Sequence, residues 1–238
     1  MLGKLILSAL IVGLIAGGIL AAIQHLRLTP LIAQAEVYET AADAAKPACT
    51  ENMAGMKMCG DDAGEGWKPA EGFQRIASTS AASMLLGAGY GIMLAGIALV
   101  SGASLTRRNG MIYGLCGFLA CALAPAMGLP PEVPGMAVAD LTARQLWWLG
   151  TVASTGLGIY LIALRHEAWA TFAAVALLAV PHLIGAPVAP NTPNQVPAEL
   201  ASRFAANSLG AAAIFWCLLG LFLGLAFERL NLQEQFHD

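Results

Sequence analysis

The sequence predicts an all-α fold, a polytopic transmembrane helical bundle, and three observations support this. Of its 238 residues, 58% are hydrophobic and 11% are charged, whereas a soluble domain carries about 25% charged residues. Six apolar stretches have the length of about 20 residues that a helix needs to cross the hydrocarbon core. None of the six contains Asp, Glu, Lys or Arg. Helices are expected because a lone apolar strand would leave its backbone unpaired in lipid.

The six predicted spans form a single integral membrane domain over residues 1–238. Their expected limits are 5–24, 76–100, 110–129, 146–164, 168–186 and 204–227. The composition excludes a disordered chain, a coiled coil and a disulfide-dense secreted module. It also disfavours a cytosolic enzyme, which needs a more charged surface.

The first span has some features of a signal peptide. Lys4 precedes the apolar run, and Ala33-Gln34-Ala35 imitates a small-residue cleavage site. However, the run is longer than the usual apolar region of about 7–15 residues. We therefore expect the segment to remain as a helix. The mature protein would have five spans if it were removed or not counted.

The connections between spans predict the orientation. Segments 101–109 and 165–167 are short and basic, whereas 36–75, 130–145 and 187–203 are longer and hold eleven of the fifteen acidic residues. The raw count of Lys and Arg is five on the side of the short connections and seven on the other. Short loops carry most of the positive-inside signal. Both termini are therefore predicted to be cytoplasmic.

Paired glycines indicate how the helices pack. A G-x-x-x-G spacing lets helix backbones approach closely in lipid. The sequence has this spacing in three of the spans, at Gly13–Gly17, Gly87–Gly91 and Gly220–Gly224. These pairs predict a compact bundle. We find no clear internal repeat, so an inverted-repeat transporter fold is unsupported.

His182 is the one His, Asp, Glu, Lys or Arg side chain within the six predicted spans. It follows Pro181, and a proline frees a carbonyl of the preceding helical turn. A polar group at membrane depth is a candidate for function. His182 is therefore a candidate metal ligand on a cation pathway. The alternative is a histidine bonded to a neighbouring helix near the membrane surface.

Segment 36–75 is the second candidate metal site, an extracytoplasmic acidic loop that contains CTENMAGMKMCG. Thiols and thioethers favour soft or borderline metals, and carboxylates favour harder ones. Two alternatives stay open, a Cys49–Cys59 disulfide in an oxidising compartment and an ordinary acidic linker. The candidate ligands in this segment are Glu36, Glu39, Cys49, Met53, Met56, Met58 and Cys59.

The proline-rich connection between the third and fourth spans supplies two more candidate ligands, Glu132 and Asp140. Prolines at 130, 131 and 134 stiffen the segment because they fix φ. A rigid loop that holds a carboxylate over the bundle could be a cation entrance. It could equally be an ordinary outer loop.

Other classes of function find little support. The net charge of −3 does not suggest nucleic-acid binding. Hydrolase, metalloprotease, Walker and dinucleotide-binding signatures are absent from the sequence, so no enzyme is predicted. Without an ATP-binding signature, energy for transport would come from a gradient or from another subunit.

Several polar blocks resemble the CbtA family of predicted cobalt transporter subunits. They are AEVYE (35–39), W-x-PAEGF-x-R (67–75), APAMGLPPEVPGM (124–136), ADLTARQLWWLGT (139–151), VPHLIGAP (180–187) and VPAEL (196–200). The resemblance implies a bacterial inner-membrane protein linked to cobalamin metabolism. It also implies a small single-span partner with a histidine-rich end, CbtB. The sequence departs from its relatives in having Cys and Met where histidines are expected in the first outer loop.

Cobalt uptake is therefore the leading expectation. Metal would be gathered by segment 36–75, Glu132 and Asp140 and passed near His182, with no tightly bound cofactor. The lipid bilayer, a CbtB-like subunit and a second copy of the chain are the expected partners. A non-transporting membrane scaffold or metal sensor is one alternative. Transport of copper or nickel is another, because sulfur ligands suit softer metals than cobalt.

Overall fold

The computed structural model describes residues 2–45, 69–70, 72–102, 105–165, 167–190 and 196–229. These residues form helices joined by loops and contain no strand, which confirms the predicted fold class. Two of the segments, η1 and η2, are π-helical turns. The elements are α1 Leu2–Ile23, η1 Gln24–Leu28, α2 Thr29–Ala45, α3 Phe73–Val100, α4 Arg107–Phe118, η2 Leu119–Leu123, α5 Ala124–Ala126, α6 Leu141–Leu164, α7 Ala168–Ile184 and α8 Ala198–Arg229.

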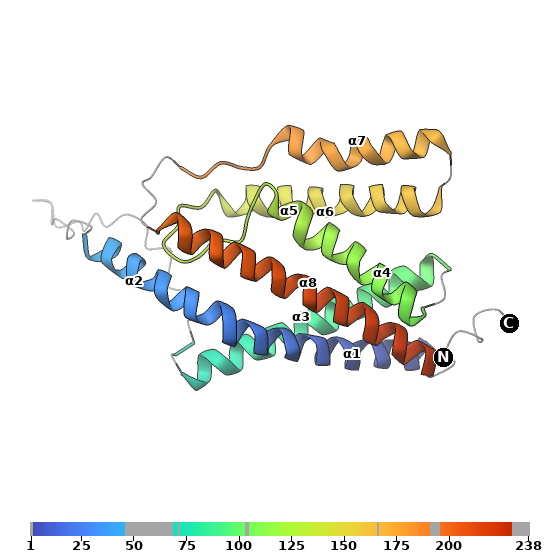
Figure 1. Cartoon of the computed structure of the whole chain (residues 1–238), viewed down its shortest axis with the longest axis horizontal. Coiled ribbons are helices and arrows are strands. Elements are labelled where there is room, and N and C mark those ends of the chain that lie inside the picture. Colours follow the sequence, from blue (N-terminus) through green and yellow to red (C-terminus); the bar gives the residue numbers. More distant parts are fainter. Residues whose placement is uncertain are drawn as a thin grey trace, which may run out of the picture.

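The helices run alternately in opposite directions along one axis (Figure 1). The start of α1, the end of α8 and the two short basic connections lie at one end, which we call the terminal end. The far end of α2 and the loop 127–140 lie at the other, which we call the loop end. Among the described residues, successive helices therefore begin and end at alternate ends of the bundle.

In the part of the chain that the structure describes, five helices are long and apolar enough to cross a membrane. The N-terminal segment is one of them, and α7 is the predicted span that falls short. With 17 residues, α7 is about 26 Å long at 1.5 Å per residue. The hydrocarbon core is about 30 Å thick. The bundle thus has five full-length helices and a sixth, shorter apolar one.

The first helical path is longer than predicted. The helix Leu2–Ala41 has 40 residues, or about 60 Å, twice the hydrocarbon thickness. The chain stays helical through η1 and α2 to Ala45. The first ten residues of segment 36–75 are therefore helical and not loop. Alanine and glutamate are frequent there, and both have high helix propensity.

The glycine pairs mark the closest helix contacts, as predicted. A methyl group built on Gly13 would overlap the carbonyl of Gly87, and one on Gly17 would overlap the carbonyl of Ser83. These contacts join α1 to α3. In the same way Gly110 of α4 and Gly220 of α8 face each other's backbones.

Helix α8 crosses the middle of the bundle, between α1 and α4 (Figure 1). Its Leu219 and Leu223 are fully buried. By contrast, α6 and α7 pack mainly on each other. This pair meets the remaining helices through contacts of α6 with η2, α5 and α4. The α6–α7 pair is therefore attached along one narrow line.

Candidate functional site

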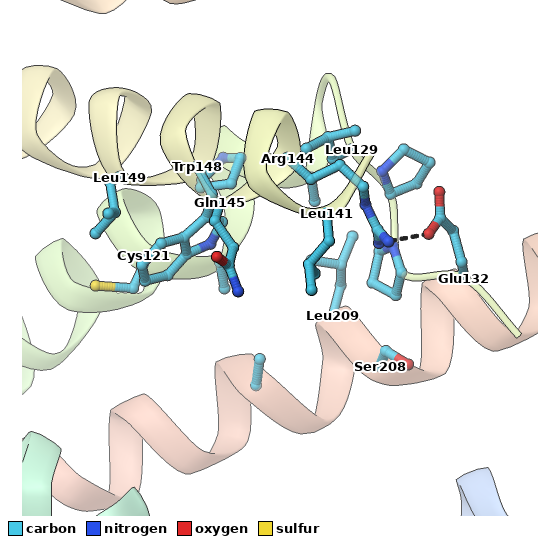
Figure 2. Close-up of a pocket in the computed structure, with 16 residues that line it drawn as sticks. Cys121, Leu129, Glu132, Leu141, Arg144, Gln145, Trp148, Leu149, Ser208 and Leu209 are labelled. Atoms are coloured by element: carbon cyan, nitrogen blue, oxygen red, sulfur yellow. Dashed lines mark hydrogen bonds and ion pairs between the residues drawn. The ribbon is translucent and has the colours of Figure 1, made fainter. Parts of the chain in front are cut away.

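A cavity of about 590 Å³ lies at the loop end, lined by residues of α6, η2, α5, α8 and the loop after α5 (Figure 2). Most of its wall is apolar, and the polar side chains come from separate elements. Glu132 belongs to the loop after α5, Arg144 and Gln145 to α6, and Ser208 to α8. Cys121 of η2 completes the set.

The loop that carries Glu132 is held by local features. Its prolines restrict φ, and Gly135 adopts a φ of 81°, a value that favours glycine. Asp140 ends the loop and accepts a hydrogen bond of 2.9 Å from the backbone N–H of Ala143. This is an N-cap, which satisfies one of the free donors of the first turn of α6. The cap fixes where α6 starts and hence where Arg144 points.

Glu132 forms an ion pair with Arg144 across the cavity wall. The Nη2 of Arg144 donates to Oε2 of Glu132 at 2.6 Å. The Arg144 side chain is only 29% exposed and the Glu132 side chain only 17% exposed. The predicted carboxylate thus lies at the cavity, but it is neutralised by a cation that the sequence did not reveal.

Two buried donors at this cavity have no hydrogen-bond partner, Nε of Arg144 and Oγ of Ser208. Figure 2 shows that they come from opposite walls, α6 and α8. Buried polar groups are nearly always hydrogen-bonded. The cavity is therefore suited to hold water or a ligand with acceptor oxygens.

His182 lies on α7 beside α6, and it does not line this cavity. Its ring meets the ring of Trp147 edge-on, with centroids 6.1 Å apart. The indole N–H of Trp147 donates to the carbonyl of Pro181 at 3.3 Å. The histidine ring therefore packs on α6, and its role as a metal ligand stays a prediction.

Glu36 and Glu39 lie on α2. Arg75 of α3 donates two hydrogen bonds to the carboxylate of Glu36, one of them 3.3 Å long. The Glu39 side chain is exposed, and its backbone lies against Gly135. Among the described residues, no three His, Cys, Asp or Glu side chains lie close enough together to hold a metal.

Comparison with known protein families decides the identity of the chain. One family model, described as "Probable cobalt transporter subunit (CbtA)", matches residues 2–228. The chain belongs to the CbtA family. The match includes both the loop that carries Glu132 and the whole of α6. Neither the curated proteins nor the solved structures contain a match.

Membership of the CbtA family gives the coarse function, a membrane-embedded subunit for cobalt transport, and the word subunit implies a partner. The sulfur-rich part of the first loop falls outside the described residues. Its candidate ligands therefore stay predictions, namely Cys49, Met53, Met56, Met58 and Cys59.

The structure of this CbtA chain also contains a polar cluster that the sequence analysis missed. In η1, Nε2 of His25 lies 3.1 Å from Oγ of Ser80, and Oε1 of Gln24 accepts a 2.7 Å hydrogen bond from Ser83. The predicted first span stopped at Gln24, so His25 was not considered. An imidazole directly after an apolar run was the available signal, whereas the π-helical turn, which often marks a functional site, is seen only in the structure.

Proposed function

We propose that this CbtA chain is the membrane-embedded part of a cobalt uptake system in a bacterial inner membrane, not an enzyme. The loop end would face outward and both termini would be cytoplasmic. Family membership supports cobalt as the cargo. The short basic connections at the terminal end support this orientation, through the positive-inside rule.

The observation that carries the proposal is the position of Glu132 in the cavity at the loop end. Carboxylates are suitable ligands for divalent metals. Nη2 of Arg144 donates to this carboxylate at 2.6 Å. An arriving cation would compete with Nη2 of Arg144 for the carboxylate. Oxygen ligands bound to the cation could then accept hydrogen bonds from Nε of Arg144 and Oγ of Ser208.

The partner and the energy source belong to the same proposal. A small single-span, histidine-containing subunit of the CbtB type would complete the system, linked to cobalamin metabolism. Energy would come from a gradient or from such a partner. The sulfur-rich part of the first loop would gather metal ahead of the cavity. Self-association of the chain is compatible with this arrangement.

Uptake of labelled Co²⁺ by cells expressing the system tests the role of Glu132. Glu132→Gln should lower the initial rate by about tenfold to a hundredfold, because a hydrogen bond to a charged group contributes about 1.5–3 kcal/mol. Glu199→Gln is the control, since Glu199 is exposed on the first turn of α8 at the same end. Equal rates for the two variants at equal expression would contradict the proposal.

The same assay separates the alternatives. His182→Ala with unchanged uptake would remove His182 from the mechanism. If Ni²⁺ or copper inhibits uptake of labelled Co²⁺ more strongly than unlabelled Co²⁺ does, then that metal and not cobalt is the preferred cargo. Purified protein that binds Co²⁺ in liposomes but moves none across would favour the scaffold or sensor.

A further inference from the structure

A second cavity, of about 320 Å³, lies farther toward the terminal end, between α3, α4, η2 and α6. Its lining is mostly apolar. The polar and sulfur-bearing side chains that line it are Met93, Ser101, Tyr113, Cys116, Cys121 and Tyr160. Three of these, Cys116, Cys121 and Met93, offer soft sulfur atoms.

The two cavities follow one another along the same pair of elements. On α6, positions 141–149 contribute to the first cavity and positions 152–164 to the second. On the facing chain, positions 121–132 contribute to the first and positions 112–121 to the second. Cys121 lines both. We call this line of contact between α6 and α4–η2 the α6 seam.

The π-helical turn explains why both thiols reach the second cavity. Cys116 and Cys121 are five residues apart, which in a regular α-helix would turn them about 140° away from each other. Cys121 lies within η2, where the wider π-turn takes up an extra residue and changes that angle. The turn thereby places a thiol at the point where the cavities meet.

The polar groups along the seam change in character with depth. The first cavity offers a carboxylate, a guanidinium and a hydroxyl, and Cys121 follows. The second cavity is lined by Cys116 and, nearer the terminal end of α3, by Ser101 and Tyr113. The hydroxyl groups of Ser101 and Tyr113 form a hydrogen bond of 2.7 Å. Candidate ligands are thus spread over the length of α6, which at 24 residues is about 36 Å and can span the bilayer.

We propose that the α6 seam is the path of the cation across the membrane, with Cys121 at the junction of the two cavities. The inference rests on the proposed function and deepens it. The cargo class is a borderline divalent cation, for which a thiol is an acceptable ligand. The attachment of α6–α7 along this seam would let the pair open either cavity.

Thiol labelling tests the path without relying on transport. Starting from Cys49→Ser, Cys59→Ser and Cys217→Ser, chains that keep only Cys121 or only Cys116 are treated in intact cells with a charged, membrane-impermeant methanethiosulfonate. Cys121 should react, and Cys116 should react more slowly. Co²⁺ at ten times its dissociation constant should slow the reaction at Cys121 roughly tenfold. A chain that keeps only Cys217 should show no protection.

A cavity-filling variant provides the second test, in the natural chain. Gly156 lines the second cavity, and a methyl group built there would contact nothing. The rest of a leucine side chain would occupy the cavity that Gly156 lines, so Gly156→Leu should reduce Co²⁺ uptake to background, with folding checked by thermal unfolding in detergent. Gly150→Leu is the matched control on the same helix, since Gly150 also has open space and does not line the two cavities.

The outcomes distinguish this inference from the proposed function. Absence of Co²⁺ uptake by the natural chain with its partner would overturn the proposed function itself. Uptake that survives Gly156→Leu, with the protein folded and expressed, would overturn the seam as the path. So would Cys121 that reacts at the same rate with and without Co²⁺.

Discussion

Glu132 and Arg144 form a partly buried ion pair, and its strength depends on how much of each side chain is exposed to solvent. The pair is partly buried, with exposed fractions of 17% and 29%. Fully exposed pairs contribute only about 0–1 kcal/mol, whereas removing one partner of a buried pair leaves an uncompensated charge. This pair should lie between those limits.

A double-mutant cycle measures the strength of this pair. With Glu132→Gln and Arg144→Gln, the coupling in the free energy of unfolding should be about 1 kcal/mol, at the upper end for exposed pairs. Denaturant unfolding in detergent is the measurement. Arg107 and Glu228 at the terminal end serve as the control pair, because Arg107 is 67% exposed and should couple more weakly. A larger coupling in the control pair would contradict this expectation.

Single residues at the site were only partly predictable from the sequence. Glu132 could be chosen because three prolines stiffen its segment. Asp140 was chosen for the same reason, and the structure gives it a helix-capping contact. Arg144 is twelve residues from Glu132, and Ser208 lies on another helix. Their meeting depends on how α6 and α8 pack, which neither spacing nor hydropathy encodes.

Among the elements, the glycine contacts lend themselves to a direct test. Gly13→Ala should destabilise the protein by about 1–3 kcal/mol, the usual cost of overpacking, because the new methyl group would overlap the backbone of α3. Gly18→Ala is the control on the same helix, where a methyl group has open space. The midpoint of thermal unfolding in detergent should fall only for Gly13→Ala. A fall of equal size in both variants would show that the contact is unimportant.

The elements themselves were predicted well where hydropathy alone decides. All six apolar stretches are helical, since a long apolar run in lipid has no other form open to it. The length of α2 was missed because its composition is polar, although its alanines and glutamates favour helix. The π-turns η1 and η2 were also missed, because a single extra residue in a turn leaves no hydropathy signal.

For the whole molecule, the orientation in the membrane is the first question to test. In a chain with its five cysteines replaced, Val188→Cys at the loop end and Val100→Cys at the terminal end are both highly exposed, at 86% and 90%. An impermeant maleimide should label position 188 in intact cells. It should label position 100 only after permeabilisation. The reverse pattern would invert the proposed orientation.

The sequence predicted the direction in which each helix runs, but not which helices pack against each other. Alternation along the chain follows from consecutive spans joined by short loops. The glycine pairs identified which faces of α1, α3 and α8 pack closely, yet they did not identify the partners. That α1 meets α3 while α4 meets α8 depends on the shape of both faces together. The position of α6–α7 at the edge of the bundle likewise depends on the shapes of the packed helix faces.

Because α7 is short, we expect the packing of lipid around this protein to depend on the thickness of the bilayer. Its length of about 26 Å falls a few ångströms short of the hydrocarbon core, and such a mismatch costs fractions of a kcal/mol per ångström. A helix this short is accommodated by thinning of the neighbouring bilayer or by snorkelling of its flanking side chains, whereas the longer α3 and α8 need neither. We therefore expect acyl-chain length to affect the edge of the bundle that borders the α6 seam.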